Sequence, residues 1–130
     1  MYSYNTPEDA IRSLEKAYTN KDIRGIVDSK DFETEALLLL QQSSYDYDEY
    51  DEALIAETAK LLELSLINVI HDNGYPNFEG LECEFFDLSL YNGNIYTIQE
   101  RINYLDGFSA LNRIFVVKHG DLWKVATIEE

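Results

Sequence analysis

The chain has 130 residues, and 45% of them are hydrophobic, which is the composition of one globular domain with its own core. The 25 acidic residues outnumber the 10 basic ones and give a formal charge of −15. This charge argues against binding to nucleic acid, whose phosphates it repels, and against binding to anionic membrane surfaces. It favours a basic partner, or serves nothing more than solubility.

Cysteine content and the first residues indicate the compartment. Cys83 is the single cysteine, so no disulfide framework forms within the chain. Residues 1–5 lack a basic region followed by an apolar run, so we expect no signal peptide. No apolar run approaches the ~20 residues that a membrane span needs. We therefore expect a cytoplasmic protein.

Residues 6–74 form the predicted helical part. Thr6 and Pro7 suit the cap and first position of a helix, and Asp22 can cap a second, short helix. A third helix is predicted to follow Asp31. It contains four successive leucines at positions 37–40, which predict burial on most sides.

A long fourth helix is predicted over residues 51–73, with Gly74 as its stop. Its acidic first turn suits the positive end of the helix dipole. Helical spacing predicts one apolar stripe along it, made of Leu54, Thr58, Leu61, Leu62, Ser65, Leu66, Val69 and Ile70.

Residues 81–128 predict a β-meander of four strands. The runs 81–90, 95–104, 108–118 and 122–128 are separated by Asn-Gly, Asp-Gly and His-Gly-Asp turns. Alternation changes phase at Phe85 and Phe86, which is typical of a bulge. The predicted fold class is α+β in a single domain, 1–130: N-terminal helices packed on a curved antiparallel sheet of about four strands.

Several short motifs recur in the order and spacing of a known family. They are TPEDAI (6–11), KDI (21–23), KDFE (30–33), ETA (57–59), LEL (62–64), NGYP (73–76), CEF (83–85) and FVVKHGDLWKV (115–125). With them the chain resembles the immunity proteins of bacterial polymorphic toxin systems that have the cone-shaped nuclear transport factor 2-like fold. The resemblance implies a protein that binds and neutralises a cognate toxin, and it transfers no catalytic residues.

An acidic, tyrosine-rich segment is the candidate partner-binding site. Tyrosines offer contact area and carboxylates pair with Arg or Lys of a basic partner. The alternative is a solvated connection whose tyrosines fold back onto the domain. The segment consists of Tyr45, Asp46, Tyr47, Asp48, Glu49, Tyr50, Asp51 and Glu52.

Glu100 marks a second candidate site, a cavity inside the cone. It shares one strand face with Tyr96 and Tyr104, and Tyr18 lies on the apolar side of the first helix. A carboxylate on such a face could act as a base, so a small-molecule binder or isomerase-like enzyme is the alternative function. An ion pair between Glu100 and Arg113 would make it structural instead.

Neither a metal nor a cofactor is predicted. Asp46 and Asp48 begin a calcium-loop pattern, but its central glycine is missing. His71 and His119 have no ligand partner at zinc-site spacing. We expect a protein that is not an enzyme. A homodimer through an outer sheet face stays open.

Overall fold

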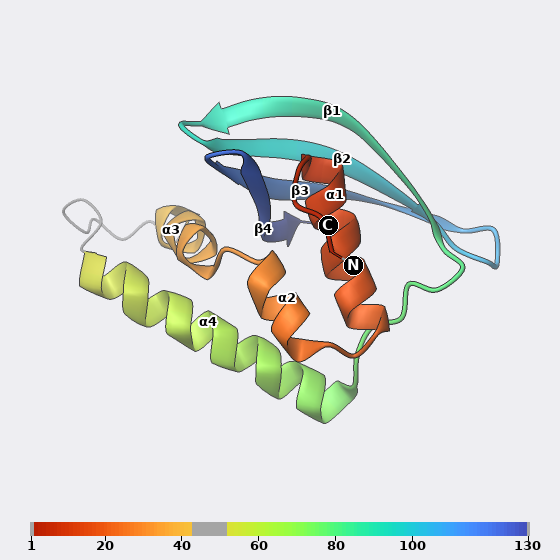
Figure 1. The fold of residues 1–130 in the computed structure, drawn as a ribbon, viewed down its shortest axis with the longest axis horizontal. Coiled ribbons are helices and arrows are strands. Elements are labelled where there is room, and N and C mark those ends of the chain that lie inside the picture. Colours follow the sequence, from red (N-terminus) through yellow and green to blue (C-terminus); the bar gives the residue numbers. More distant parts are fainter. Residues whose placement is uncertain (1, 43–51, 130) are drawn as a thin grey trace.

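The computed structural model describes residues 2–42 and 52–129 and shows helices first, then strands. Figure 1 shows the four helices gathered on the concave side and at one end of a single curved sheet. The elements are α1 (Pro7–Thr19), α2 (Ile23–Ser29), α3 (Phe32–Gln42), α4 (Glu52–Asn73), β1 (Glu82–Asn92), β2 (Ile95–Asn103), β3 (Ser109–His119) and β4 (Leu122–Glu129). The predicted α+β class and element order are confirmed.

Local sequence signals account for the helix ends. Thr6 Oγ1 accepts a hydrogen bond from the Asp9 N–H at 3.0 Å, and Pro7 takes the first helical position of α1. Asp22 caps α2 by accepting from the Gly25 N–H at 3.1 Å. Gly74, with φ +84°, follows the last residue of α4, where a left-handed residue is needed.

The sheet has the strand order β1-β2-β3-β4 and is antiparallel throughout. A bulge bends β1, as the change of phase predicted, but it lies after Phe86 rather than at it. Phe86 pairs with Gln99 and Ser89 pairs with Thr97, so β1 has one extra residue between them. Asp87 takes φ +56° there. Asp and Asn are the non-glycine residues that tolerate this conformation best.

Buried side chains form two clusters, one on each side of β3. Ile114 and Val116 belong to the first, with α1 and α2, while Phe115 and Val117 belong to the second, with Leu38 of α3. Alternate residues of a strand face opposite ways, so one strand serves both clusters. The first cluster fixes α1 in the concavity of the sheet (Figure 1).

Two predictions about helix burial are wrong. The leucines of α3 are not buried on most sides, because Leu39 is 46% exposed and the fully buried positions are Ala36 and Leu38. In α4 the predicted stripe is rotated: Leu61 is 66% exposed and Val69 52% exposed. α4 lies along α3 and away from the sheet, so it buries a narrower face than the sequence suggested (Figure 1).

Candidate functional site

The predicted partner-binding segment falls almost wholly outside the described residues. Residues 45–51 are not described, and Glu52 is exposed at the first position of α4. The segment joins the end of α3 at Gln42 to the start of α4. Its position in the chain is therefore known, while its contacts stay a prediction.

The inner face of β2 carries the predicted cavity residues. Glu100 is 2% exposed and belongs to the middle of β2, opposite Phe85 of β1. Tyr96 is half-buried, and its ring centroid lies 5.1 Å from that of Trp123 in an edge-on contact. Tyr96 therefore contributes to the core of the sheet's concave side.

The other two predicted cavity residues are Tyr18 and Tyr104. The ring of Tyr18, on α1, is half-buried, with its centroid 6.2 Å from that of Phe78. Burial raises the pKa of Tyr18, and the charge of Glu35 adds to the effect. Tyr104 follows the end of β2, is 42% exposed, and donates its N–H to Phe108 O in the hairpin. Tyr104 thus lies at an exposed turn, whereas Tyr18 and Tyr96 both pack against the first buried cluster.

Glu100 instead lies in a cluster with Glu15 of α1 and Cys83 of β1. One potential ligand atom from each residue, an oxygen or the sulfur, lies within 4.8 Å of the other two. Cys83 Sγ donates to Glu15 Oε1 at 3.7 Å. Glu100 Oε2 is buried and has no hydrogen-bond partner among the residues that the structure describes.

Burial dominates the protonation of this cluster. It raises the pKa of Glu15 to about 9, and the hydrogen bond and charge of Glu100 act in the same direction. Arg12, whose guanidinium carbon lies 4.8 Å from the centre of the Phe85 ring, partly opposes the shift. Burial and the two carboxyls also raise the pKa of Cys83 to about 12. Burial therefore favours the neutral forms of the Glu15 carboxyl and the Cys83 thiol.

The ion pair between Glu100 and Arg113 does not form. Arg113 binds Glu129 of β4 instead, with Nη2 2.7 Å and Nε 2.8 Å from Oε1. Arg113 pairs with Gln99 across β2 and β3, so it lies on the opposite face from Glu100. Glu100 is thus a buried carboxyl without a basic partner among the described residues.

A small pocket of about 300 Å³ opens beside the cluster. Glu15 and Cys83 line it, together with Arg12, Lys16, Thr19, Phe78, Glu79 and Leu81. Glu100 is absent from this lining and lies behind the other two residues. Solvent can thus reach Glu15 and Cys83 through the pocket.

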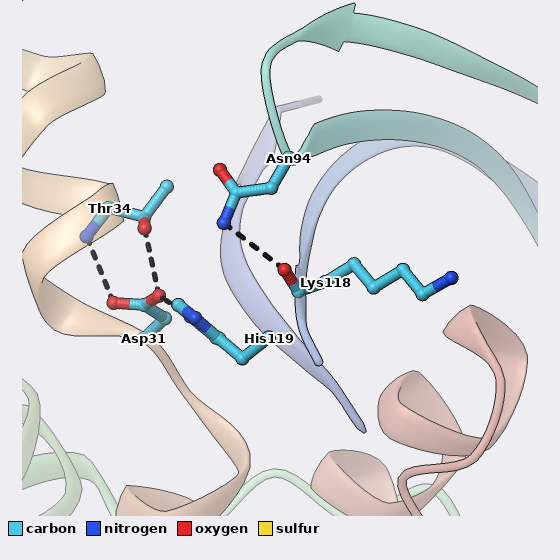
Figure 2. Close-up of polar contacts among 5 residues, drawn as sticks. All are labelled: Asp31, Thr34, Asn94, Lys118 and His119. Carbon is cyan, nitrogen blue, oxygen red and sulfur yellow. Dashed lines mark hydrogen bonds and ion pairs between the residues drawn. The ribbon is translucent and has the colours of Figure 1, made fainter. Parts of the chain in front are cut away.

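A larger groove of about 910 Å³ runs between the start of α3, the first half of α4 and the β3–β4 hairpin. Its charged lining is mixed: Lys30, Asp31, Glu33, Lys60, Glu63, His119 and Lys124. Asp31 belongs to this lining, and its Oδ2 lies 2.5 Å from His119 Nε2 and 2.8 Å from the Thr34 hydroxyl (Figure 2). Asn94 nearby donates to Lys118 O at 3.1 Å. No local pattern predicts the contact between His119 and Asp31, since 88 residues separate them.

Comparison with known proteins identifies the fold. The chain superposes with a TM-score of 0.53 on a Campylobacter jejuni structure named "Putative NTF2-like transpeptidase", at 14% sequence identity. The match covers 94% of this chain and 98% of that one. At such low identity the likeness shows the fold alone: the chain has the NTF2-like fold, as the sequence resemblance implied. No family model and no curated protein matches the sequence.

Membrane insertion by a helix is not supported. Among the residues described, none of the helices combines the length and the apolar composition that crossing a bilayer requires.

Proposed function

We propose that this protein is an immunity protein, which binds and neutralises a cognate bacterial toxin by non-catalytic contact. The observation that carries the proposal is the distribution of charge. Residues 6–74 contain 16 acidic and 6 basic residues, whereas residues 81–128 contain 6 and 4. The acidic excess is therefore concentrated in the helical part, and a basic toxin is its complement.

The acidic segment 45–52 lies within this helical part, at the α3–α4 connection. It has five carboxylates, three tyrosines and no Lys or Arg. Carboxylates steer a basic partner during encounter, and tyrosines then supply contact area at a low cost in side-chain entropy. We propose that the toxin docks there.

The concave face of the sheet supports binding rather than catalysis. α1 packs into the concavity, and Glu100 lies behind Glu15 and Cys83 instead of at the base of an open cavity. The pocket beside Glu15, about 300 Å³, is at the lower limit of small-molecule sites. A small-molecule binder or isomerase-like enzyme is therefore the weaker proposal.

The decisive measurement is binding to the toxin domain encoded beside this protein. We expect a stoichiometric complex with an association rate that falls steeply as salt is added. Absence of a complex at micromolar concentration would refute the proposal.

Substitution of the segment locates the docking site. Replacing Asp46, Asp48, Glu49 and Asp51 together by Asn and Ser should slow association at low salt by about tenfold or more and weaken its salt dependence. The measurement is stopped-flow association at several ionic strengths.

A matched control removes the same number of charges from the other half of the molecule. Glu79, Glu82, Glu84 and Asp121 are all exposed and can be replaced by Gln and Asn. This variant should retain most of the association rate. If both variants slow association equally, only the net charge matters and the toxin docks elsewhere.

A further inference from the structure

Three potential metal ligands from three different elements meet beneath the sheet. Glu15 comes from α1, Cys83 from β1 and Glu100 from β2, and 68 residues separate the first two. In the register of β1 and β2, Cys83 pairs with Ile102 and Phe85 pairs with Glu100. Cys83 and Glu100 are therefore diagonal neighbours on one face of the sheet, directly over α1.

Their spacing is close to that of ligands around one ion. Zinc bonds of about 2.0 Å to oxygen and 2.3 Å to sulfur place tetrahedral ligands about 3.5 Å apart. Cys83 Sγ and Glu15 Oε1 are 3.7 Å apart, and no two ligand atoms of the group are separated by more than 4.8 Å. Contraction of these separations toward about 3.5 Å would bring all three atoms onto one cation.

The unpartnered oxygen of Glu100 points to a ligand. Its side chain is 98% buried, and Oε2 has no hydrogen-bond partner in the described part of the chain. Glu100 shares a hydrogen bond with Glu15, but a buried carboxyl oxygen that has no partner of its own still costs free energy, because it has lost its hydration. A cation between Glu100, Glu15 and Cys83 supplies the missing interaction.

We propose that Glu15, Cys83 and Glu100 bind one divalent cation of the zinc type, through one oxygen of each carboxylate and the sulfur of the thiolate, and that binding releases the protons of Glu15 and Cys83 to solvent. The pocket of about 300 Å³ that Glu15 and Cys83 line gives the ion a path from solvent and gives a water molecule the fourth position. This inference does not depend on the proposed toxin binding.

The ligand set selects the metal. Magnesium and calcium prefer oxygen ligands alone and coordinate six or more of them. A thiolate together with two carboxylates suits zinc, which accepts sulfur, nitrogen and oxygen ligands in tetrahedral sites. The side chain of Arg12, close enough to affect Glu15, offsets the negative charge that three anionic ligands leave around a divalent ion.

Cobalt titration of the full chain tests the proposal, because Co²⁺ replaces Zn²⁺ and has a visible spectrum. One equivalent of Co²⁺ should produce a sulfur-to-cobalt charge-transfer band in the near ultraviolet, and Zn²⁺ should abolish it. Cys83 is the single cysteine, so Cys83→Ser must eliminate the band. Glu100→Gln should weaken Co²⁺ binding by more than about tenfold, since even outer-shell changes cost that much.

Glu84→Gln is the matched control. Glu84 follows Cys83 on β1 but is exposed on the other face, so its loss should leave Co²⁺ affinity unchanged. Circular dichroism checks the fold of each variant. A measurement without substitution complements them: one equivalent of Zn²⁺ should slow the modification of Cys83 by a maleimide.

Two results would overturn the proposal. Cobalt binding without a sulfur band would place the metal on surface carboxylates. A maleimide reaction equally fast with and without Zn²⁺ would show that the ion does not engage Cys83.

Discussion

Asp31 binds three groups with one carboxylate. Oδ1 accepts from the Thr34 N–H at 3.0 Å, and Oδ2 accepts from the Thr34 hydroxyl and contacts His119 (Figure 2). Burial acts to raise the pKa of Asp31, but the hydrogen bonds from Thr34 and His119 outweigh it and hold the pKa below its ordinary value. The side chain thus fastens the start of α3 to the β3–β4 hairpin.

Removal of this carboxylate should destabilise the protein in a pH-dependent way. Asp31→Ala should lose about 1–2 kcal/mol near pH 7, as helix caps do. The folded pKa is lower than the unfolded value of about 4, so the contribution is present above that value. It is lost as the pH falls through the folded pKa. Urea unfolding at a series of pH values measures the effect.

Two variants separate the roles of Asp31. Asp31→Asn keeps a capping oxygen and should lose less stability than Asp31→Ala. His119→Gln keeps both bonds to Thr34 and should also lose less. A difference between wild type and Asp31→Ala that stays constant down to acidic pH would contradict the assignment.

At the scale of single residues, the sequence predicts that Glu100 lies on an apolar strand face, but it does not predict the residues that contact Glu100. Alternation along β2 singled out a carboxyl on an apolar face, because strand periodicity is a local property. Glu15 was not predicted as a site residue, because its position in the sequence does not indicate that α1 packs into the concavity of the sheet. The meeting of Glu15, Cys83 and Glu100 depends on tertiary packing, and no spacing along the chain encodes it.

At the scale of elements, the packing of the N-terminal stretch against α2 requires a glycine at position 25. A Cβ at Gly25 would lie 2.7 Å from Tyr2 Cε2 and 2.7 Å from Asp22 Oδ2. These two side chains are joined by a hydrogen bond of 2.7 Å from the Tyr2 hydroxyl. Gly25 therefore leaves the room in which the N-terminal stretch docks against α2.

Gly25→Ala should destabilise the protein even though alanine is the better helix former. Helix propensity favours Ala by about 1 kcal/mol, but forcing the Tyr2 ring away costs typically 1–3 kcal/mol. We expect a net loss, measured as a lower urea midpoint. In a Tyr2→Ala background the same substitution should cost less, because the obstructing ring is gone. Equal costs in both backgrounds would exclude the Tyr2 ring as the cause.

The elements were predictable where the signal is local. Caps such as Thr6, stops such as Gly74 and the Asn-Gly and Asp-Gly turns determine where helices and strands end. The exposed faces of α3 and α4 were not predictable, because a leucine-rich helix offers several apolar stripes. The packing of α4 on α3 determines which apolar stripe is buried, and it leaves Leu61 and Val69 exposed to solvent.

For the whole molecule, the uneven charge should make stability depend on salt. The helical part carries most of the excess negative charge, and its carboxylates repel one another in the folded state. Raising ionic strength from about 0.01 M to about 1 M shortens the screening length from about 30 Å to about 3 Å. We expect Tm to rise by roughly 3–6 °C if screening recovers about 1 kcal/mol.

Differential scanning fluorimetry in NaCl measures this rise. The variant without the four carboxylates of residues 46, 48, 49 and 51 should respond less, because part of the repulsion has been removed. Exposed ion pairs such as Arg113–Glu129 work against the trend but contribute little. A Tm that falls with salt would mean that ion pairs outweigh repulsion.

The bulges of β1 have a consequence for solubility. β1 spans 11 residues along an edge of an open sheet, and such an edge invites a strand from another molecule to add. The irregularities after Phe86 and after Leu90, with the left-handed Asp87 between them, interrupt the row of free backbone groups. An incoming strand can therefore pair over only a few residues, which protects the molecule against edge-to-edge aggregation.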